Sequence, residues 1–170
     1  MKLYLCLLLV ASCRYSVIAA DIVADTCNKL VDNHLTYNFC VAFLQTDPKS
    51  KTSNIQELDL ISIELSIANL TSYIPFIQDQ IKNHGGDAET RSSLTACLVT
   101  YDDGISSLYQ AKKLFESWDY SGTLELLRNA AGTPDQCEGK FSKQNSPLTE
   151  MNNICRSVLI IPLHITSLLK

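Results

Sequence analysis

The sequence predicts an all-α protein, with an N-terminal helical hairpin followed by an up-down-up-down four-helix bundle and two disulfides. Apolar residues recur at spacings of three and four along most of the chain, which is typical of amphipathic helices. Short polar segments with glycine or proline separate these stretches, and short connections favour antiparallel neighbours. Cysteines that follow a secretory leader indicate disulfide bonds.

Residues 1–20 have the pattern of a secretory signal peptide. Lys2 gives a positive start, residues 3–10 are largely apolar, and Ala19 and Ala20 are small residues suited to cleavage. The mature chain then spans residues 21–170, which is enough for one domain with a hydrophobic core. We therefore expect a secreted, extracellular protein.

Loss of Lys2 and Arg14 with the leader leaves 12 basic and 18 acidic residues, a net charge of −6. This negative balance argues against nucleic acid as a partner. No internal stretch reaches the roughly 20 apolar residues that span a bilayer. The nearest stretch, residues 158–165, contains Pro162 and His164, so we expect a buried helix there and no membrane partner.

The hairpin is predicted over residues 21–46, where Cys27 and Cys40 frame two short helices joined at Asn33 and His34. Cys27, His34 and Cys40 could be imagined as metal ligands. Their spacing is far from the close cysteine pairs of zinc sites, however, and a fourth ligand is not evident. A disulfide is the favoured state of cysteines in a secreted chain, so no metal and no cofactor are expected.

The bundle is predicted over residues 54–170. Ser53 or Asn54 caps its first helix, whose apolar residues step by three and four from residue 55 to residue 81. The chain turns at residues 84–87, and a second long helix continues to about Ser117. Gly104 within this helix leaves room for close packing.

A bend at residues 119–122 starts the third helix, which is predicted to bend or break near Gly132. A polar loop, residues 142–146, then leads to Pro147 at the first position of the fourth helix. Five cysteines remain in the mature chain, of which four are expected to pair, and the residues alone leave three pairings open for any four. Cys155, on a strongly apolar helix, is expected to be a buried thiol.

No catalytic residues are predicted, and we expect no enzyme activity. Cys155 and His164 lie nine residues apart, too far to form a nucleophile and base within one helical turn. Two acidic pairs are expected on solvated helix faces because their side chains diverge: Asp102 with Asp103, and Glu57 with Asp59. Asn69 begins an Asn-Leu-Thr sequon and is a glycosylation candidate.

Several features follow one another along the mature chain: the cysteine-framed hairpin, Cys97 in a long helix, Asp119-Tyr120, Cys137 followed by Glu138 and Phe141, and Ser146-Pro147 before a last helix. In this order they resemble the plant invertase/pectin methylesterase inhibitor family over essentially the whole mature chain. The segments ADIVADTC and YNFCVAFLQTDPKS are most similar to the plane-tree pollen allergen type of that family. The resemblance implies a place in the plant cell wall or apoplast, disulfides joining Cys27 to Cys40 and Cys97 to Cys137, and Cys155 as a free thiol.

The resemblance also implies a function. Members of the family inhibit carbohydrate-active enzymes by occupying their clefts as folded proteins, so the first expectation is a 1:1 complex with pectin methylesterase (pectinesterase). Invertase inhibitors of the family use a Pro-Lys-Phe triplet where this chain has Tyr120, Ser121 and Gly122, which makes cell-wall or vacuolar acid invertase the alternative target. A further alternative is a non-inhibitory secreted bundle, allergen-like, with a small-ligand or storage role.

The inhibitory surface is expected on the bundle and at the bend. The candidate contact residues are Tyr73, Tyr109, Asp119, Tyr120, Ser121 and Gly122. For Phe76 and Trp118 we expect core packing, because aromatic residues fill cores as well as interfaces. We also expect the hairpin, as a unit separate from the bundle, to be available for pairing two copies in a homodimer.

Overall fold

The computed structural model describes residues 21–32, 35–83, 87–141 and 145–170, and all regular structure within these ranges is helical. The predicted signal peptide, the joint at Asn33 and His34, and the turn at residues 84–86 lie outside the described residues. The all-α prediction is confirmed.

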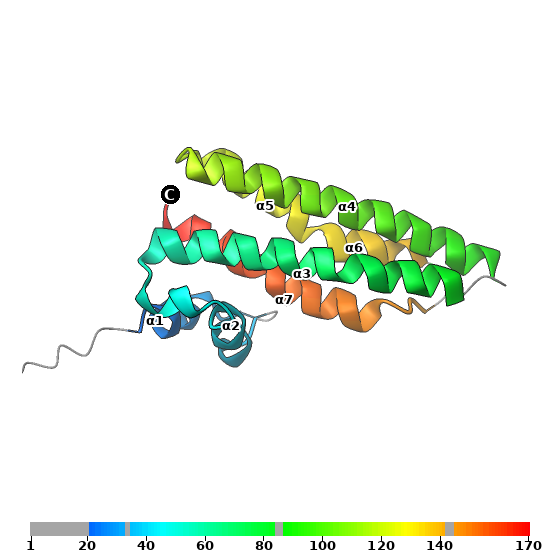
Figure 1. The fold of residues 1–170 in the computed structure, drawn as a ribbon, viewed down its shortest axis with the longest axis horizontal. Helices are drawn as coiled ribbons and strands as arrows, with labels where there is room; N and C mark the ends of the chain where they lie inside the picture. Colours follow the sequence, from blue (N-terminus) through cyan, green and yellow to red (C-terminus); the bar gives the residue numbers. More distant parts are fainter. Residues whose placement is uncertain (1–20, 33–34, 84–86, 142–144) are drawn as a thin grey trace, which may run out of the picture.

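Two short helices form the hairpin, α1 (Ile22–Leu30) and α2 (Tyr37–Leu44). A short 3-10 helix, η1 (Pro48–Thr52), connects it to the bundle. The bundle contains α3 (Ile55–Asn83), α4 (Ala88–Glu116), α5 (Tyr120–Ala131), α6 (Thr133–Glu138), a second 3-10 helix η2 (Gly139–Phe141), and α7 (Thr149–Leu168). Figure 1 shows that α3, α4, the pair α5 and α6, and α7 alternate in direction, as predicted.

Side chains at the helix starts satisfy the first free backbone N–H groups. The amide of Glu57 donates to Asn54 Oδ1 and the amide of Asn54 donates to Glu57 Oε2, both at 2.9 Å. This reciprocal pair is a capping box, and it starts α3 at one of the two residues that the sequence offered. Four other helices have a side-chain N-cap without the reciprocal bond, in which the side chain accepts a hydrogen bond from an amide two or three residues later. These caps are Asp21 for α1, Thr36 for α2, Asp87 for α4 and Asp119 for α5.

The start of α7 differs from the prediction. Pro147 lies in a turn, and the helix begins two residues later at Thr149. The hydroxyl of Ser146 accepts from the amide of Leu148 at 3.0 Å, which closes the turn around Pro147 before helical bonding begins.

The long helix α3 packs against α4 and α7. Its fully buried residues Ile63, Leu70 and Ile77 belong to one core cluster with residues of α4, α5, α6 and α7. By length and composition α3 could also cross a membrane, since an 18-residue window within it has a mean hydropathy of 1.4. Residues 158–165 are therefore not the nearest match to a membrane span, contrary to the prediction.

The third bundle helix is broken where the sequence predicted it. α5 ends at Ala131 and α6 begins at Thr133, and Pro134 in the first turn of α6 has no N–H to continue the hydrogen-bond ladder. Gly104 of α4 faces this break. A Cβ atom at residue 104 would lie 3.2 Å from Cβ of the buried Thr133 and closer still to its hydroxyl, so only glycine lets α6 approach α4 this closely.

The hairpin packs on the bundle and does not stand apart from it. Val23 and Leu44 of the hairpin share a buried cluster with Leu58 of α3 and with Ile161 and Ile165 of α7. Figure 1 shows α1 and α2 against the end of the bundle where α3 begins and the chain ends. The separation from which a dimer contact was predicted is therefore wrong, because detaching the hairpin would expose this apolar cluster to water.

Candidate functional site

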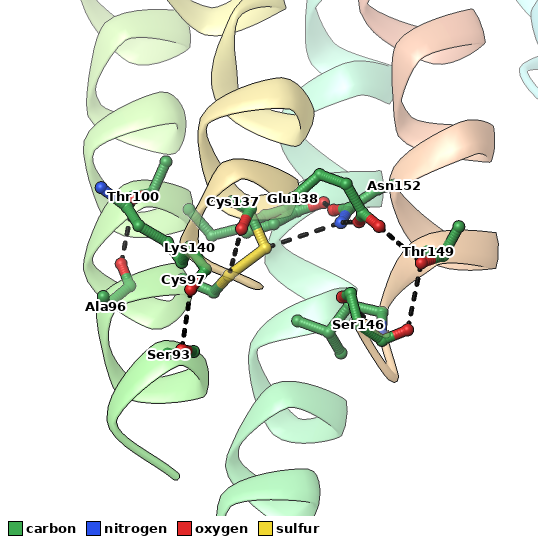
Figure 2. Close-up of a disulfide and its surroundings, with 12 residues drawn as sticks. Ser93, Ala96, Cys97, Thr100, Cys137, Glu138, Lys140, Ser146, Thr149 and Asn152 are labelled. Carbon is green, nitrogen blue, oxygen red and sulfur yellow. Dashed lines mark hydrogen bonds between the residues drawn. A yellow bond between two sulfur atoms is a disulfide. The ribbon is translucent and has the colours of Figure 1, made fainter. Parts of the chain in front are cut away.

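A disulfide and a network of hydrogen bonds between polar side chains stabilise the half of the bundle that lies away from the hairpin. The structure joins Cys97 of α4 to Cys137 of α6, and it joins Cys27 of α1 to Cys40 of α2, the same pairs that the resemblance implies. Beside the first bond, the buried Asn152 of α7 donates to Glu138 Oε2 at 2.6 Å (Figure 2). This network ties α4, α6 and α7 together.

Two further bonds complete the network. Tyr101 Oη donates to Asn152 Oδ1 at 2.7 Å, and the hydroxyl of Thr149 donates to Glu138 Oε1 at 2.6 Å. Every member thus has a partner, which is the condition under which a buried polar group stabilises a fold. Tyr101 and Asn152 are fully buried, whereas Glu138 is half-buried and Thr149 is exposed, so the network runs from the core to the surface.

The free thiol, that of Cys155, has low reactivity. Cys155 is fully buried on α7, and burial raises the pKa of its thiol to about 12. A thiol with such a pKa is almost entirely protonated at neutral pH and is a poor nucleophile. His164, on the same helix, has Nε2 3.8 Å from Asp32 Oδ2 of the hairpin. No nucleophile and base are brought together by these residues.

Asp59 is buried, contrary to the solvated position that was expected for it. Burial is the main reason that the pKa of its carboxyl rises from 3.8 to about 7. The hydroxyl of Thr166 donates to its Oδ2 at 2.7 Å and the hydroxyl of Ser62 donates to its Oδ1 at 3.2 Å. Helical spacing places Asp59 four residues before Ile63, on the face of α3 that also carries Leu70 and Ile77, so the apolar row itself was the signal for its burial.

The bend between α4 and α5 has a well-defined hydrogen-bond pattern. The amide of Asp119 donates to the carbonyl of Leu114 at 3.0 Å, and the amide of Trp118 donates to the carbonyl of Phe115 at 2.9 Å. These bonds close the end of α4 as in a Schellman motif, with Trp118 in the left-handed position at φ 62°. Asp119 then caps α5 by accepting from the amide of Gly122 at 2.9 Å.

Three aromatic rings gather at this bend. Tyr120 is half-buried between Phe115, with ring centroids 5.4 Å apart, and Trp118, at 6.3 Å. Trp118 is 70% exposed and Ser121 is exposed. We call Trp118, Asp119, Tyr120 and Ser121 the bend surface. The expectation that Trp118 packs in the core is wrong, because α4 ends before its side chain can turn inward.

Gly122 takes part in the bend as a spacer. A Cβ atom at residue 122 would lie 2.6 Å from Asp119 Oδ2 and 2.7 Å from Leu114 Cδ1. A larger residue at this position would displace the cap of α5. Gly122 therefore shapes the bend surface and contributes no side chain to it.

The remaining candidates lie elsewhere on the bundle. Tyr73 of α3 is half-buried and meets Tyr101 edge-on, with centroids 6.2 Å apart, and burial raises the pKa of its hydroxyl. Because Tyr101 precedes Trp118 by 17 residues on one helix, Tyr73 lies about 25 Å from the bend surface. Tyr109 is 53% exposed on α4, roughly 13 Å before the bend. The six candidates therefore do not form one surface.

Phe76 is 45% exposed on α3, so the expectation of core packing is wrong for this residue also. It lines a shallow groove between α3 and α7, together with Tyr73, Pro147, Glu150, Met151 and Ile154. Asn69, one turn before Tyr73, is half-buried with its amide oxygen out of contact with solvent and without a hydrogen-bond donor. It remains a glycosylation candidate, which a mass shift lost on glycosidase treatment would test.

Within the described ranges, no group of three or more His, Cys, Asp or Glu side chains is placed to hold a metal ion.

The sequence of residues 21–163 matches the family model described as plant invertase/pectin methylesterase inhibitor. This match covers most of the chain. The chain belongs to the plant invertase/pectin methylesterase inhibitor family.

Individual members of the family are similar over most of their length. A Platanus acerifolia protein named "Putative invertase inhibitor" is 35% identical over 91% of this chain and 88% of its own. "Pectinesterase inhibitor 12" of Arabidopsis thaliana is 31% identical over 89% of each chain. A crystal structure of a mutant pectin methylesterase inhibitor from Arabidopsis superimposes with a TM-score of 0.70 at 21% identity, covering 85% of this chain and 96% of the other. This likeness confirms the helical-bundle fold.

Proposed function

We propose that this member of the inhibitor family binds pectin methylesterase and blocks its active-site cleft in a 1:1 complex. Family membership over residues 21–163 and the relatives named pectinesterase inhibitors support an inhibitor of this kind. The observation that carries the choice of target is the bend surface, because an invertase inhibitor of this family is expected to present a Pro-Lys-Phe triplet there.

The geometry at Gly122 bears directly on that choice. This chain has Tyr120, Ser121 and Gly122 at the place of the triplet, and a side chain at residue 122 would collide with the cap of α5. A side chain at this position would have to push aside the Asp119 carboxylate and the end of the Leu114 side chain, which would disturb the cap of α5. The invertase contact implied by the resemblance is therefore missing from this chain.

Charge favours the same target. Hydrolysis of a pectin methyl ester leaves a carboxylate, so a pectin methylesterase must accommodate an increasingly anionic polymer, whereas sucrose is neutral. A cleft suited to a polyanion attracts a negatively charged partner, and the mature chain carries a net charge of −6.

Acid invertase remains a second candidate target because of the names of the relatives. Two Platanus proteins, 35% and 33% identical to this chain, are both named as putative invertase inhibitors. In either case we propose that the chain catalyses no reaction itself. The buried, protonated Cys155 and the lack of a nearby base among the described residues support this.

Inhibition assays test the proposal. Purified mature chain (residues 21–170) is titrated into a fixed amount of pectin methylesterase and, separately, of acid invertase at pH 5. We expect loss of pectin demethylation to saturate at one equivalent and sucrose hydrolysis to continue. If only invertase loses activity, acid invertase is the target and the proposal for pectin methylesterase is wrong. If both enzymes keep full activity, the chain is not an inhibitor of either, and a non-inhibitory secreted bundle becomes the better interpretation.

We also propose secretion to the cell wall, based on the signal peptide predicted for residues 1–20. The full chain expressed in plant cells should be recovered from the extracellular fluid with Asp21 as its first residue. Recovery of the uncleaved chain from the cytoplasm would contradict this.

A homodimer through the hairpin is a separate proposal. Val31 and Tyr37 are exposed apolar side chains on the hairpin, and their replacement leaves the buried face of the hairpin intact. Light scattering on the parent and on a V31S/Y37S variant tests it. A parent that is monomeric at all concentrations would exclude the dimer.

A further inference from the structure

Trp118 combines a backbone conformation and an exposure that the fold does not require. Its φ of 62° lies in the left-handed region, where a Cβ atom crowds the following carbonyl. It is the one residue other than glycine with positive φ within the described ranges. Glycine normally ends a helix at this position because it has no Cβ atom.

The Trp118 side chain adds little to the hydrophobic core. It is 70% exposed, and its ring meets the ring of the half-buried Tyr120 edge-on. Glycine at residue 118 would keep both backbone hydrogen bonds of the bend and relieve the crowding. Folding stability thus does not account for a tryptophan here.

We propose that Trp118 is the residue by which this inhibitor anchors itself in the cleft of pectin methylesterase. The proposal rests on the function proposed above and adds the point of contact. Tryptophan is the residue type most typical of interface hot spots, because it buries a large rigid surface at little entropic cost. Strained residues that the surrounding structure holds in place are found preferentially at functional sites.

The surroundings of Trp118 fit the charge of this partner. Glu116 and Asp119 flank it as exposed acidic side chains, and Glu116 shares Lys112 with Glu64 of α3. An apolar ring beside acidic side chains is complementary to a cleft that binds an anionic polysaccharide. The bend between α4 and α5 lies at one end of the bundle (Figure 1).

Substitutions at residue 118 separate binding from folding. We expect W118G to weaken inhibition of pectin methylesterase at least about tenfold. Its melting temperature should be no lower than that of the parent, because relief of the left-handed strain offsets the lost contact with Tyr120. W118F, which keeps an aromatic ring, should stay within about threefold of the parent. V99A is the matched control, because Val99 is an exposed apolar residue on the same helix about 28 Å from the bend.

The mature chain contains a single tryptophan, which provides a second and direct readout. With 5-fluorotryptophan incorporated, its one 19F resonance should shift on addition of the enzyme and saturate at one equivalent. An unmoved resonance while the enzyme loses activity would overturn the proposal, as would parent-like inhibition by W118G. A W118G variant that melts lower and inhibits less in proportion would show a structural role. If the parent itself fails to inhibit, the proposed function fails, and this inference with it.

Discussion

Asp59 shows how one buried side chain can make the whole protein sensitive to pH. Its carboxyl lies between α3 and α7 and accepts hydroxyl hydrogen bonds from each, yet these bonds do not compensate for the loss of hydration of its charged form. The folded chain therefore holds a proton here that the unfolded chain loses near pH 4. At pH 5 the carboxyl of Asp59 in the folded chain is therefore protonated.

We predict that stability falls as pH rises from about 4 to about 7. Within this window the folded state is protonated at Asp59 and the unfolded state is not, so unfolding releases a proton, at a cost in stability of at most about 1.4 kcal/mol per pH unit. Above about pH 7 both states are ionised and this contribution is constant. Chemical denaturation of the parent and of D59N across this range measures it, and D59N should have the shallower slope. D103N, at an exposed position on α4, serves as the control and should follow the parent.

Cys155 should resist alkylation as long as the fold is intact. The thiol is fully buried and burial raises its pKa to about 12, so both access and the reactive thiolate are lacking. Native protein treated with iodoacetamide at pH 7.5 should gain no mass, and denatured, unreduced protein should gain one adduct. Rapid modification of the native protein at a rate near that of a free peptide thiol would contradict the buried position.

The contact between α4 and α6 shows what a single glycine does for two helices. Gly104 allows Thr133 to approach the backbone of α4, and the Cys97–Cys137 disulfide joins the same two helices 40 residues apart in sequence. Gly104 lies in a helix interior, where glycine is otherwise unfavourable by about 1 kcal/mol relative to alanine. The close approach is the reason that this position is glycine.

G104A should therefore destabilise the protein despite the better helix propensity of alanine. We expect a net loss of about 1–2 kcal/mol in the free energy of unfolding, since overpacking a buried contact costs about 1–3 kcal/mol. G139A is the matched control, because no atom lies within 4 Å of a Cβ built there, and it should change stability by less than about 0.5 kcal/mol. Adding T133A should recover part of the loss, and strictly additive effects would argue against the contact.

At the scale of the whole molecule, the hairpin and the bundle share a buried apolar cluster. Leu58, Ile161 and Ile165 of the bundle contact the disulfide-linked hairpin, whose own length would not support a core. The two parts are thus expected to unfold in one transition.

I161A tests this coupling. Removal of a fully buried isoleucine should cost about 2–5 kcal/mol and should speed hydrogen exchange in α1 and in α3 alike. I154A makes the same chemical change on the same helix at a position that is 42% exposed, and it should have a much smaller effect. Faster exchange confined to α1 would show that the hairpin opens independently.

The sequence by itself determined the local structure of this protein. Apolar spacing of three and four predicted the long helices, the capping type of Asn54 marked the start of α3, and Gly132 with Pro134 marked the break between α5 and α6. These features depend on neighbours within about one helical turn, so they can be read from order alone. The family was also evident from the order of cysteines and bends, which the match over residues 21–163 confirms.

Only the tertiary structure decided which side chains are covered. Asp59 was expected in solvent and is buried, whereas Phe76 and Trp118 were expected in the core and are exposed. The six candidate contact residues were likewise predicted as one set, but Tyr73 lies far from the bend surface. Periodicity fixes the face of a helix on which a residue lies, but burial depends on whether another helix packs over that face. Such packing joins segments distant in sequence, as where Thr166 of α7 covers Asp59 of α3.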